Sequence, residues 1–91
     1  MSIEKHLEIL GKVQGVGFRA FVLKNAQNLN IDGWVRNTYD GKVEAVFSGS
    51  ENAVDKIISK VRKGPRWADV EKVNISDYDG KKDFKGFHIR S

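Results

Sequence analysis

The sequence has no cysteine, a single proline and no long hydrophobic run. Without cysteine, the chain can form neither a disulfide framework nor a thiolate metal site, and nothing in it requires an oxidising compartment. The absence of a proline-rich or serine-rich stretch leaves no candidate linker between domains. No apolar run approaches the roughly 20 residues that a transmembrane helix needs, and the amino terminus lacks the apolar stretch of a signal peptide. We therefore expect a protein of the cytoplasm without a membrane partner.

The length and composition predict one globular domain covering residues 1–91. Hydrophobic residues make up 40% and charged residues 31%, as in ordinary globular proteins. The formal net charge of +4 favours an anionic partner, either a phosphorylated metabolite or nucleic acid. The excess is small, so a solvated basic surface without any such partner fits the same number.

Apolar residues alternate with polar ones in several short segments, which predicts strands. These segments cover about residues 3–12, 31–36, 43–47, 70–75 and 84–89. Between them, apolar residues at a helical spacing predict a first helix over about residues 18–30 and a second over residues 51–63. Ser50 is suited to cap the start of the second helix, and Gly64 is suited to end it.

The predicted order is strand, helix, strand, strand, helix, strand, with a short extra strand after a turn at residues 79–82. This β-α-β-β-α-β order is that of the ferredoxin-like fold in the α+β class. We expect an antiparallel sheet with both helices packed on one face, so that the two apolar helix stripes and one sheet face form a single core.

The first segment that indicates a function is the loop between the first strand and the first helix, residues 11–19. Gly15 and Gly17 permit positive φ angles and a close approach of the backbone to a ligand. Unpaired N–H groups at the start of a helix can then surround an anion, and Arg19 can bind two phosphate oxygens at once. The alternative is an ordinary strand-to-helix connection in which the glycines serve the turn and Arg19 is solvated.

The second segment covers residues 33–44 and contains Asp40 and Gly41, a pair typical of hairpin turns. By itself, Asn37 before this turn is most simply explained as a turn residue. The fold order raises another interpretation, because the first strand ends and the second strand returns at the same edge of the sheet. If the third strand lies between them, their axes are about 10 Å apart. Arg19 and Asn37 can then reach one ligand.

Together, the two segments resemble the two signatures of the acylphosphatase family. The first signature, Gly-x-Val-Gln-Gly-Val-x-Phe-Arg, is matched by residues 11–19, and the second, Gly-x-Val-x-Asn-x-x-Asp-Gly-x-Val-Glu, by residues 33–44. Parts of residues 64–70 and residues 86–89 also resemble family positions, so the resemblance covers nearly the whole chain. It implies a ferredoxin-like fold and hydrolysis of acyl phosphates to a carboxylate and inorganic phosphate.

The resemblance also implies roles for single residues. By position, Arg19 matches the family's phosphate-binding arginine, and Asn37 matches the asparagine that orients the attacking water. The phosphate-cradling loop of the family corresponds to Gln14, Gly15, Val16, Gly17 and Phe18. Ala20 stands where a bulky aromatic residue is often expected, which bears on the substrate pocket or on helix packing.

The chemistry of acyl phosphates fits a site that has no acidic or basic side chain in a catalytic role. The leaving group is a weakly basic carboxylate, which needs little help from a general acid. Backbone amides and Arg19 would stabilise charge on the phosphoryl oxygens, and Asn37 would hold a water in line with phosphorus. An amide is not usefully basic, so we hypothesise that the water passes its proton to a phosphoryl oxygen of the substrate.

We expect no metal and no other cofactor. His6 and His88 lie on predicted strands without a third ligand at a suitable spacing, so we interpret both as structural or surface residues. Trp34, Tyr39 and Trp67 could flank the acyl group of a substrate, although packing explains them more simply.

The competing interpretation is a ferredoxin-like RNA-binding module, since the chain is basic and residues 85–89 partly resemble the start of an RNP1 motif. That interpretation leaves both long signatures unexplained. A nearer alternative is a regulatory or carbamoyl-phosphate-handling domain of the same family. We therefore expect a monomer that acts on a small acyl phosphate, with inorganic phosphate as product and inhibitor and without a specific nucleic-acid partner.

Overall fold

A computed structural model of the chain describes residues 2–81 and 83–91. Its elements are β1 (Ser2–Lys12), α1 (Phe18–Asn28), β2 (Asp32–Asn37), β3 (Val43–Ser50), α2 (Glu51–Lys63), β4 (Asp69–Asp77) and β5 (Phe87–Ile89). The predicted β-α-β-β-α-β order with a short closing strand is therefore confirmed. The turn predicted at residues 79–82 includes Lys82, which lies outside the described residues.

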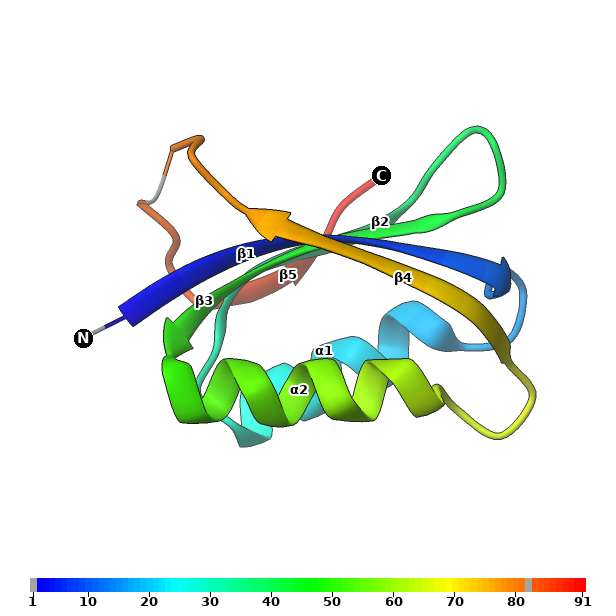
Figure 1. The fold of residues 1–91 in the computed structure, drawn as a ribbon, viewed down its shortest axis with the longest axis horizontal. Coiled ribbons are helices and arrows are strands. Elements are labelled where there is room, and N and C mark those ends of the chain that lie inside the picture. Colours follow the sequence, from blue (N-terminus) through cyan, green and yellow to red (C-terminus); the bar gives the residue numbers. More distant parts are fainter. Residues whose placement is uncertain (1, 82) are drawn as a thin grey trace.

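The strand β3 lies at the centre of a five-stranded sheet with the order β4-β1-β3-β2-β5 (Figure 1). It pairs antiparallel with both β1 and β2, and β1 pairs antiparallel with β4. The sheet differs from the expected antiparallel one at β5, which pairs parallel with β2. The reason is that the chain crosses from β4 to the opposite edge of the sheet and enters β5 in the direction of β2 (Figure 1).

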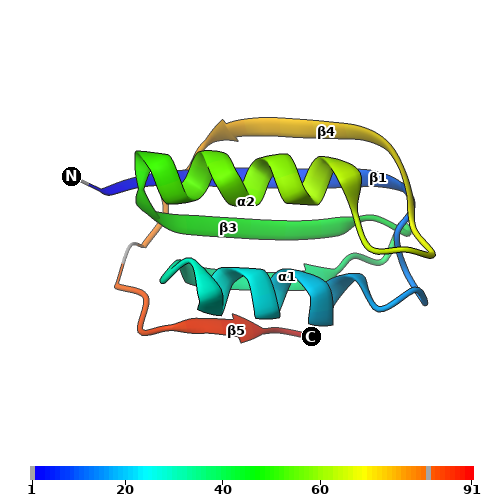
Figure 2. The ribbon, with the colours of Figure 1, turned by 90° about the horizontal axis from the view of Figure 1, so that it is seen from below.

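Both helices cover one face of the sheet, as the sequence predicts (Figures 1 and 2). The strand residues that face the helices are fully buried, among them Leu7, Val35 and Phe47. They belong to one core with Val22 of α1 and Ile57 of α2. The expected core between two helix stripes and one sheet face is therefore confirmed, and no helix in the described part of the chain covers the opposite sheet face.

Some apolar side chains lie differently from the predicted pattern. Val46 points to the sheet face without helices, opposite to its neighbour Phe47, and is nevertheless fully buried. Ile75 of the predicted fourth strand is 37% exposed, because it lies near the end of the edge strand β4. Phe84, expected in the closing strand, lies before β5, and its ring packs on Tyr78 with the centroids 5.9 Å apart.

The ends of α2 follow the predicted capping pattern. Ser50 Oγ accepts a hydrogen bond of 3.1 Å from the N–H of Ala53 at the start of the helix. At its end, the N–H of Gly64 donates to the carbonyl oxygen of Lys60 at 2.9 Å. α1 ends slightly before its predicted end, and the chain then turns through Asn30 with a φ of 54°.

Gly33 of β2 occupies a position where no residue with a side chain fits. Its φ is 132°, and a Cβ atom there would overlap the carbonyl oxygen of Val46 on β3. We expect Gly33→Ala to lower the free energy of unfolding by about 3 kcal/mol or more. Urea denaturation measures the change. Gly49→Ala is the control, because a methyl group there makes ordinary contacts with Ile31 and Val54, and a similar loss in both variants would contradict the argument.

Candidate active site

The loop from β1 to α1 has the backbone geometry that anion binding requires. Gly15 and Gly17 have φ angles of 73° and 78°, in the left-handed region that favours glycine. Gly17 is the N-cap of α1, and no side chain caps this helix start. Among the described residues, none accepts a hydrogen bond from the backbone N–H groups of residues 15–20. These groups and the positive end of α1 are therefore available to an anion.

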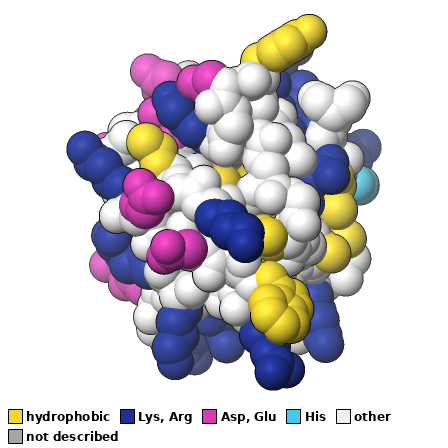
Figure 3. All heavy atoms as spheres, turned by 90° about the vertical axis from the view of Figure 1, so that its right-hand side faces the viewer, with side chains coloured by type: hydrophobic (Ala, Val, Ile, Leu, Met, Phe, Trp, Pro, Cys, Tyr) yellow, Lys and Arg dark blue, Asp and Glu magenta, His cyan; other side chains and the backbone are white. Residues whose placement is uncertain are grey.

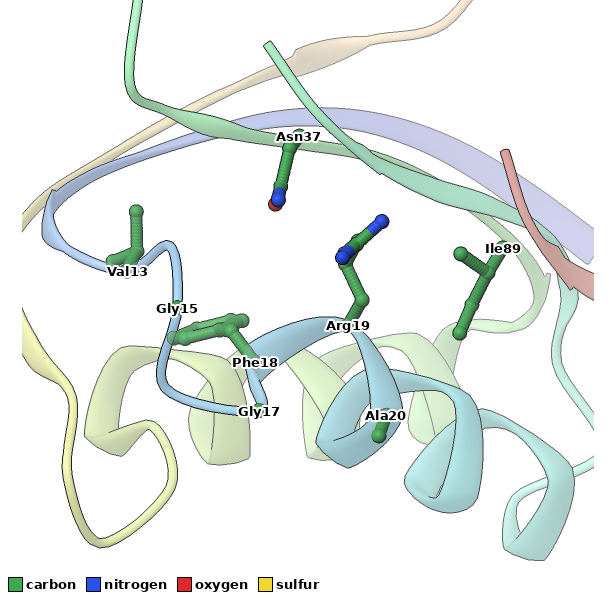
Figure 4. Close-up of a pocket in the computed structure, with 8 residues that line it drawn as sticks. All are labelled: Val13, Gly15, Gly17, Phe18, Arg19, Ala20, Asn37 and Ile89. Carbon is green, nitrogen blue, oxygen red and sulfur yellow. The ribbon is translucent and has the colours of Figure 1, made fainter. Parts of the chain in front are cut away.

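A cavity of about 380 Å³ lies against this loop (Figure 4). Its lining residues come from the loop, α1, β2 and β5, and they are Val13, Gly15, Gly17, Phe18, Arg19, Ala20, Asn37 and Ile89. Arg19 extends into the cavity from the first turn of α1, and Asn37 extends into it from the last position of β2 (Figure 4). The juxtaposition of Arg19 and Asn37 that the strand order predicts is therefore confirmed.

Arg19 carries the one charged side chain among the described residues that line the cavity. No ion pair joins its guanidinium to a carboxylate in the described parts of the chain. In Figure 4 the guanidinium lies between Asn37 and Ile89, facing the space beside the loop. An unpaired guanidinium next to free N–H groups is suited to a strongly anionic group such as a phosphoryl group.

Gln14 and Val16 do not line the cavity, unlike the other residues of the predicted phosphate loop. The side chain of Gln14 reaches the β2–β3 hairpin, where Nε2 donates to the carbonyl oxygens of Thr38 and Lys42 at 2.8 Å each. Val16 packs against the core and is partly buried. The Gln14 amide thus joins the loop to the residue that follows Asn37, which fixes the two sides of the cavity relative to each other.

The hairpin that carries Asn37 is held by its own polar groups. Thr38 Oγ1 donates to Asp40 Oδ1 at 2.5 Å, and Lys42 Nζ lies 3.2 Å from Asp40 Oδ2. The hydrogen bonds from Thr38 and Lys42 lower the pKa of the exposed Asp40 carboxyl. Asp40 therefore serves the turn, in agreement with the Asp-Gly turn sequence.

A second network holds β2 from the sheet face opposite to the cavity. Glu44 Oε2 lies 2.6 Å from His6 Nε2, and Glu44 Oε1 accepts a hydrogen bond of 2.6 Å from Arg36 Nε. Burial raises the pKa of the Glu44 carboxyl, but the hydrogen bonds from His6 and Arg36 outweigh burial and leave the pKa below its ordinary value. His6 is therefore a structural residue, as the sequence predicts, and the network anchors the position next to Asn37.

The aromatic residues considered as neighbours of the acyl group do not line the cavity. Tyr39 and Trp67 are both exposed. Trp34 lies on the sheet face without helices, where the Arg90 guanidinium is 4.7 Å from its ring centroid. The simpler interpretation of the three residues, packing at the core or surface, therefore holds, because strand alternation and loop position direct them away from the cavity.

Two lining residues were not considered for the site from the sequence, Val13 and Ile89, whereas Ala20 was connected with the substrate pocket or helix packing and does line the cavity. Val13 lies within the first signature, so its position in the chain could have indicated it. Ile89 gives no local signal. It reaches the cavity only because β5 pairs parallel with β2 and brings Ile89 beside Val35.

The end of the molecule that carries the loop and the hairpin is shown face-on in Figure 3. Lys and Arg side chains gather along its lower rim, over the helix layer, and Asp and Glu side chains lie toward one side (Figure 3). Basic groups around a cavity raise the local concentration of anions. This distribution is consistent with an anionic ligand.

Two other kinds of feature are not found in the described residues. No group of three or more His, Cys, Asp or Glu side chains is placed there to hold a metal ion. No described helix has both the length and the apolar character needed to cross a membrane.

The chain is similar to known proteins over almost its whole length. The family model described as Acylphosphatase matches residues 5–89. An acylphosphatase of Moorella thermoacetica is 44% identical over 89 residues, which cover 98% of this chain and 95% of that protein. The crystal structure of acylphosphatase from Bacillus subtilis has a TM-score of 0.93 at 32% identity, covering 100% of both chains. The structure of an acylphosphatase from Coxiella burnetii has a TM-score of 0.92 at 35% identity, covering 98% and 93% of the two chains.

Replacing Gln14 with Met removes both hydrogen bonds to the hairpin while keeping the length of the side chain. The carbonyl oxygen of Thr38 still accepts a hydrogen bond from the N–H of Gly41, and the carbonyl oxygen of Lys42 still accepts one from the N–H of Thr38. We therefore expect a loss of about 2 kcal/mol in the free energy of unfolding, near 1 kcal/mol per bond. Urea denaturation checks this value. The control Gln27→Met, at an exposed position of α1, should change stability by less than about 0.5 kcal/mol, and equal losses would contradict the role of Gln14.

Glu44→Gln should make stability less dependent on pH on the acid side. Because the pKa of Glu44 is lowered in the folded protein, the unfolded chain takes up this proton first as the pH falls. The stabilisation by the carboxylate is therefore complete well above pH 4.5, the ordinary pKa, and is lost as the pH falls through the lowered folded value. Urea denaturation of both proteins from neutral pH to about pH 3 should show their difference in stability closing toward acid. A difference that widens toward acid would contradict the assignment.

Proposed function

This chain belongs to the acylphosphatase family, and we propose that its loop amides and Arg19 hold the phosphoryl group of the substrate while Asn37 orients the attacking water. The enzyme hydrolyses the carboxyl–phosphate anhydride of acyl phosphates to a carboxylate and inorganic phosphate. One observation supports this division of roles: an unpaired guanidinium, an asparagine amide and free backbone N–H groups meet in one cavity.

The phosphoryl group binds through donors that are already oriented in the folded chain. The N–H groups of residues 15–20 have no partner among the described residues, so binding breaks no internal hydrogen bond. The Arg19 fork donates to two phosphoryl oxygens at once. Both sets of donors face the equatorial oxygens, on which negative charge is spread in the transition state. They therefore lower the barrier without contributing a covalent step.

The attacking water is held by Asn37 in line with phosphorus. The amide accepts a hydrogen bond from the water or donates one to it, and it does not remove a proton. As the bond from the water oxygen to phosphorus forms, the bond from phosphorus to the acyl oxygen breaks, and the carboxylate leaves with the electron pair. No Asp, Glu or His is among the described residues that line the cavity, so the water passes its proton to a phosphoryl oxygen.

The known proteins that this chain resembles give no support to the RNA-binding alternative. The sheet face without helices, which would have to contact RNA, also carries the carboxylates of Glu4, Glu8 and Glu44, so it is not a uniformly basic surface. The enzyme accordingly acts on a small acyl phosphate, and inorganic phosphate competes with it for the loop. A cytoplasmic location, a monomeric state and the lack of a specific nucleic-acid partner stay predictions.

The proposed roles predict different losses for Arg19→Lys and Asn37→Ala. Lysine keeps the charge but loses the fork, so phosphate affinity and turnover should both fall, with activity lower by about two orders of magnitude or more. Asn37→Ala should lower kcat strongly and leave phosphate affinity nearly unchanged, because Asn37 contacts the water. Steady-state kinetics and calorimetric titration with phosphate measure both effects.

Two exposed positions away from the cavity provide matched controls for these variants. Arg62→Lys in the last turn of α2 and Asn74→Ala on β4 should leave both measurements unchanged. Near-normal turnover of Asn37→Ala would show that Asn37 is only a turn residue. An equal loss of phosphate binding and turnover would instead make Asn37 a phosphate ligand, and the division of roles would be wrong.

Hydrolysis should proceed without any metal ion, since Arg19 and the loop amides occupy the positions where a cation would act. Exhaustive treatment with a chelator, followed by assay in metal-free buffer, should leave kcat and KM unchanged. Activity that disappears on chelation and returns with a single divalent cation would show that this part of the proposal is wrong.

A further inference from the structure

The cavity that contains Arg19 and Asn37 has two chemically different sides. The loop side offers the N–H groups of residues 15–20, which suit the phosphoryl group. On the other side of Arg19 from the loop, the lining consists of Ile89 on β5 and Ala20 on α1 (Figure 4). A ligand that fits both sides has an anionic head and an apolar body.

Ile89 is a large apolar side chain that the fold leaves open. It is 42% exposed, whereas Phe87, on the same face of β5, is 6% exposed. Its strand neighbour Val35 is fully buried, whereas Ile89 lines the cavity. In Figure 4 the side chain points from β5 toward α1 and lies beside Arg19. An apolar group that rests against Ile89 removes this surface from water.

The direction of the reaction places the acyl group on this side. In-line displacement requires that the attacking water and the leaving oxygen lie on opposite sides of phosphorus. Asn37 extends from the sheet, so the acyl oxygen leaves on the side of α1 (Figure 4). Ala20 lies in the first turn of that helix, and its small methyl group leaves space beside Ile89.

We propose that Ile89 and Ala20 form the subsite for the acyl group, and that this subsite favours acyl groups with an apolar body larger than a methyl group. The proposal rests on the proposed function and specifies its substrate class. Apolar contact is the source of the preference, because Arg19 is engaged by the phosphoryl group and no other described lining residue is charged. Ile89 is thus a specificity-determining residue.

The test compares two substrates that share the phosphoryl group, benzoyl phosphate and acetyl phosphate, with the full chain and with Ile89→Thr. Threonine keeps the β-branched shape that suits a strand but replaces apolar surface with a hydroxyl group. We expect kcat/KM for benzoyl phosphate to fall about five- to ten-fold and that for acetyl phosphate to change less than about twofold. Inhibition by inorganic phosphate should stay the same, because the loop is untouched.

Ile75→Thr is the matched control, since it makes the same change at a similarly exposed position of β4 away from the cavity. Ile75→Thr should leave kcat/KM for both substrates unchanged, and Ile89→Val should keep most of the preference for benzoyl phosphate. Thermal unfolding establishes that each variant is folded. If Ile89→Thr does not fold, inhibition of the unmodified enzyme by benzylphosphonate and by methylphosphonate decides the point, with the benzyl compound expected to bind several-fold more tightly.

The outcomes separate this inference from the function on which it rests. Equal losses with both substrates, or altered inhibition by phosphate, would overturn the subsite, because Ile89 would then act through the fold or the phosphate loop. An enzyme that hydrolyses both substrates without preferring benzoyl phosphate, or that binds the two phosphonates equally, would overturn the subsite and leave the proposed function intact. Hydrolysis of neither substrate would overturn the proposed function and the subsite with it.

Discussion

The site depends on the antiparallel pairing of β3 with both β1 and β2. This pairing puts the end of β1, which leads into the loop, and the end of β2, which carries Asn37, at one edge of the sheet. Two strand spacings separate them, about 10 Å, and the cavity of about 380 Å³ lined by Arg19 and Asn37 lies at this edge. The amide of Gln14 bridges this separation through the carbonyl oxygens of Thr38 and Lys42. Strand pairing thus sets the width of the cavity, and the side chain of Gln14 holds its two sides at that separation.

The loop shows how a short chain can present positive charge from its own backbone. Its glycines adopt left-handed backbone conformations, no described residue accepts from the N–H groups of residues 15–20, and the start of α1 adds the positive end of the helix dipole. These groups are oriented when the chain folds, so they need little reorganisation when charge moves onto the phosphoryl oxygens. An acyl phosphate suits such a site, because its leaving group is already a good one. The folded backbone then has only to bind, orient and stabilise.

Features that depend on sequence neighbours or strand order could be predicted, and those that depend on side-chain direction or distant pairing could not. The positions of Arg19 and Asn37 follow from two signatures and from the order of elements. Gln14 was assigned to the phosphate loop by position, but only the three-dimensional structure shows its side chain reaching the hairpin. Ile89 was missed for a different reason. The parallel pairing of β5 with β2 is decided by a long connection that carries no local pattern.

The same pairing has an evolutionary consequence. The groups proposed to bind the phosphoryl head belong to the loop between β1 and α1 and to the start of α1, whereas one wall of the cavity comes from a three-residue strand at the far end of the sequence. This strand lies at the sheet edge and pairs with β2 alone. Phe87 of this strand belongs to the core, but Ile89 is partly exposed, so changes at Ile89 can accumulate with little effect on the loop or the central strands. Duplicated copies of such a gene could diverge in the metabolites they accept through changes at the carboxyl end, while the hydrolytic chemistry stays the same.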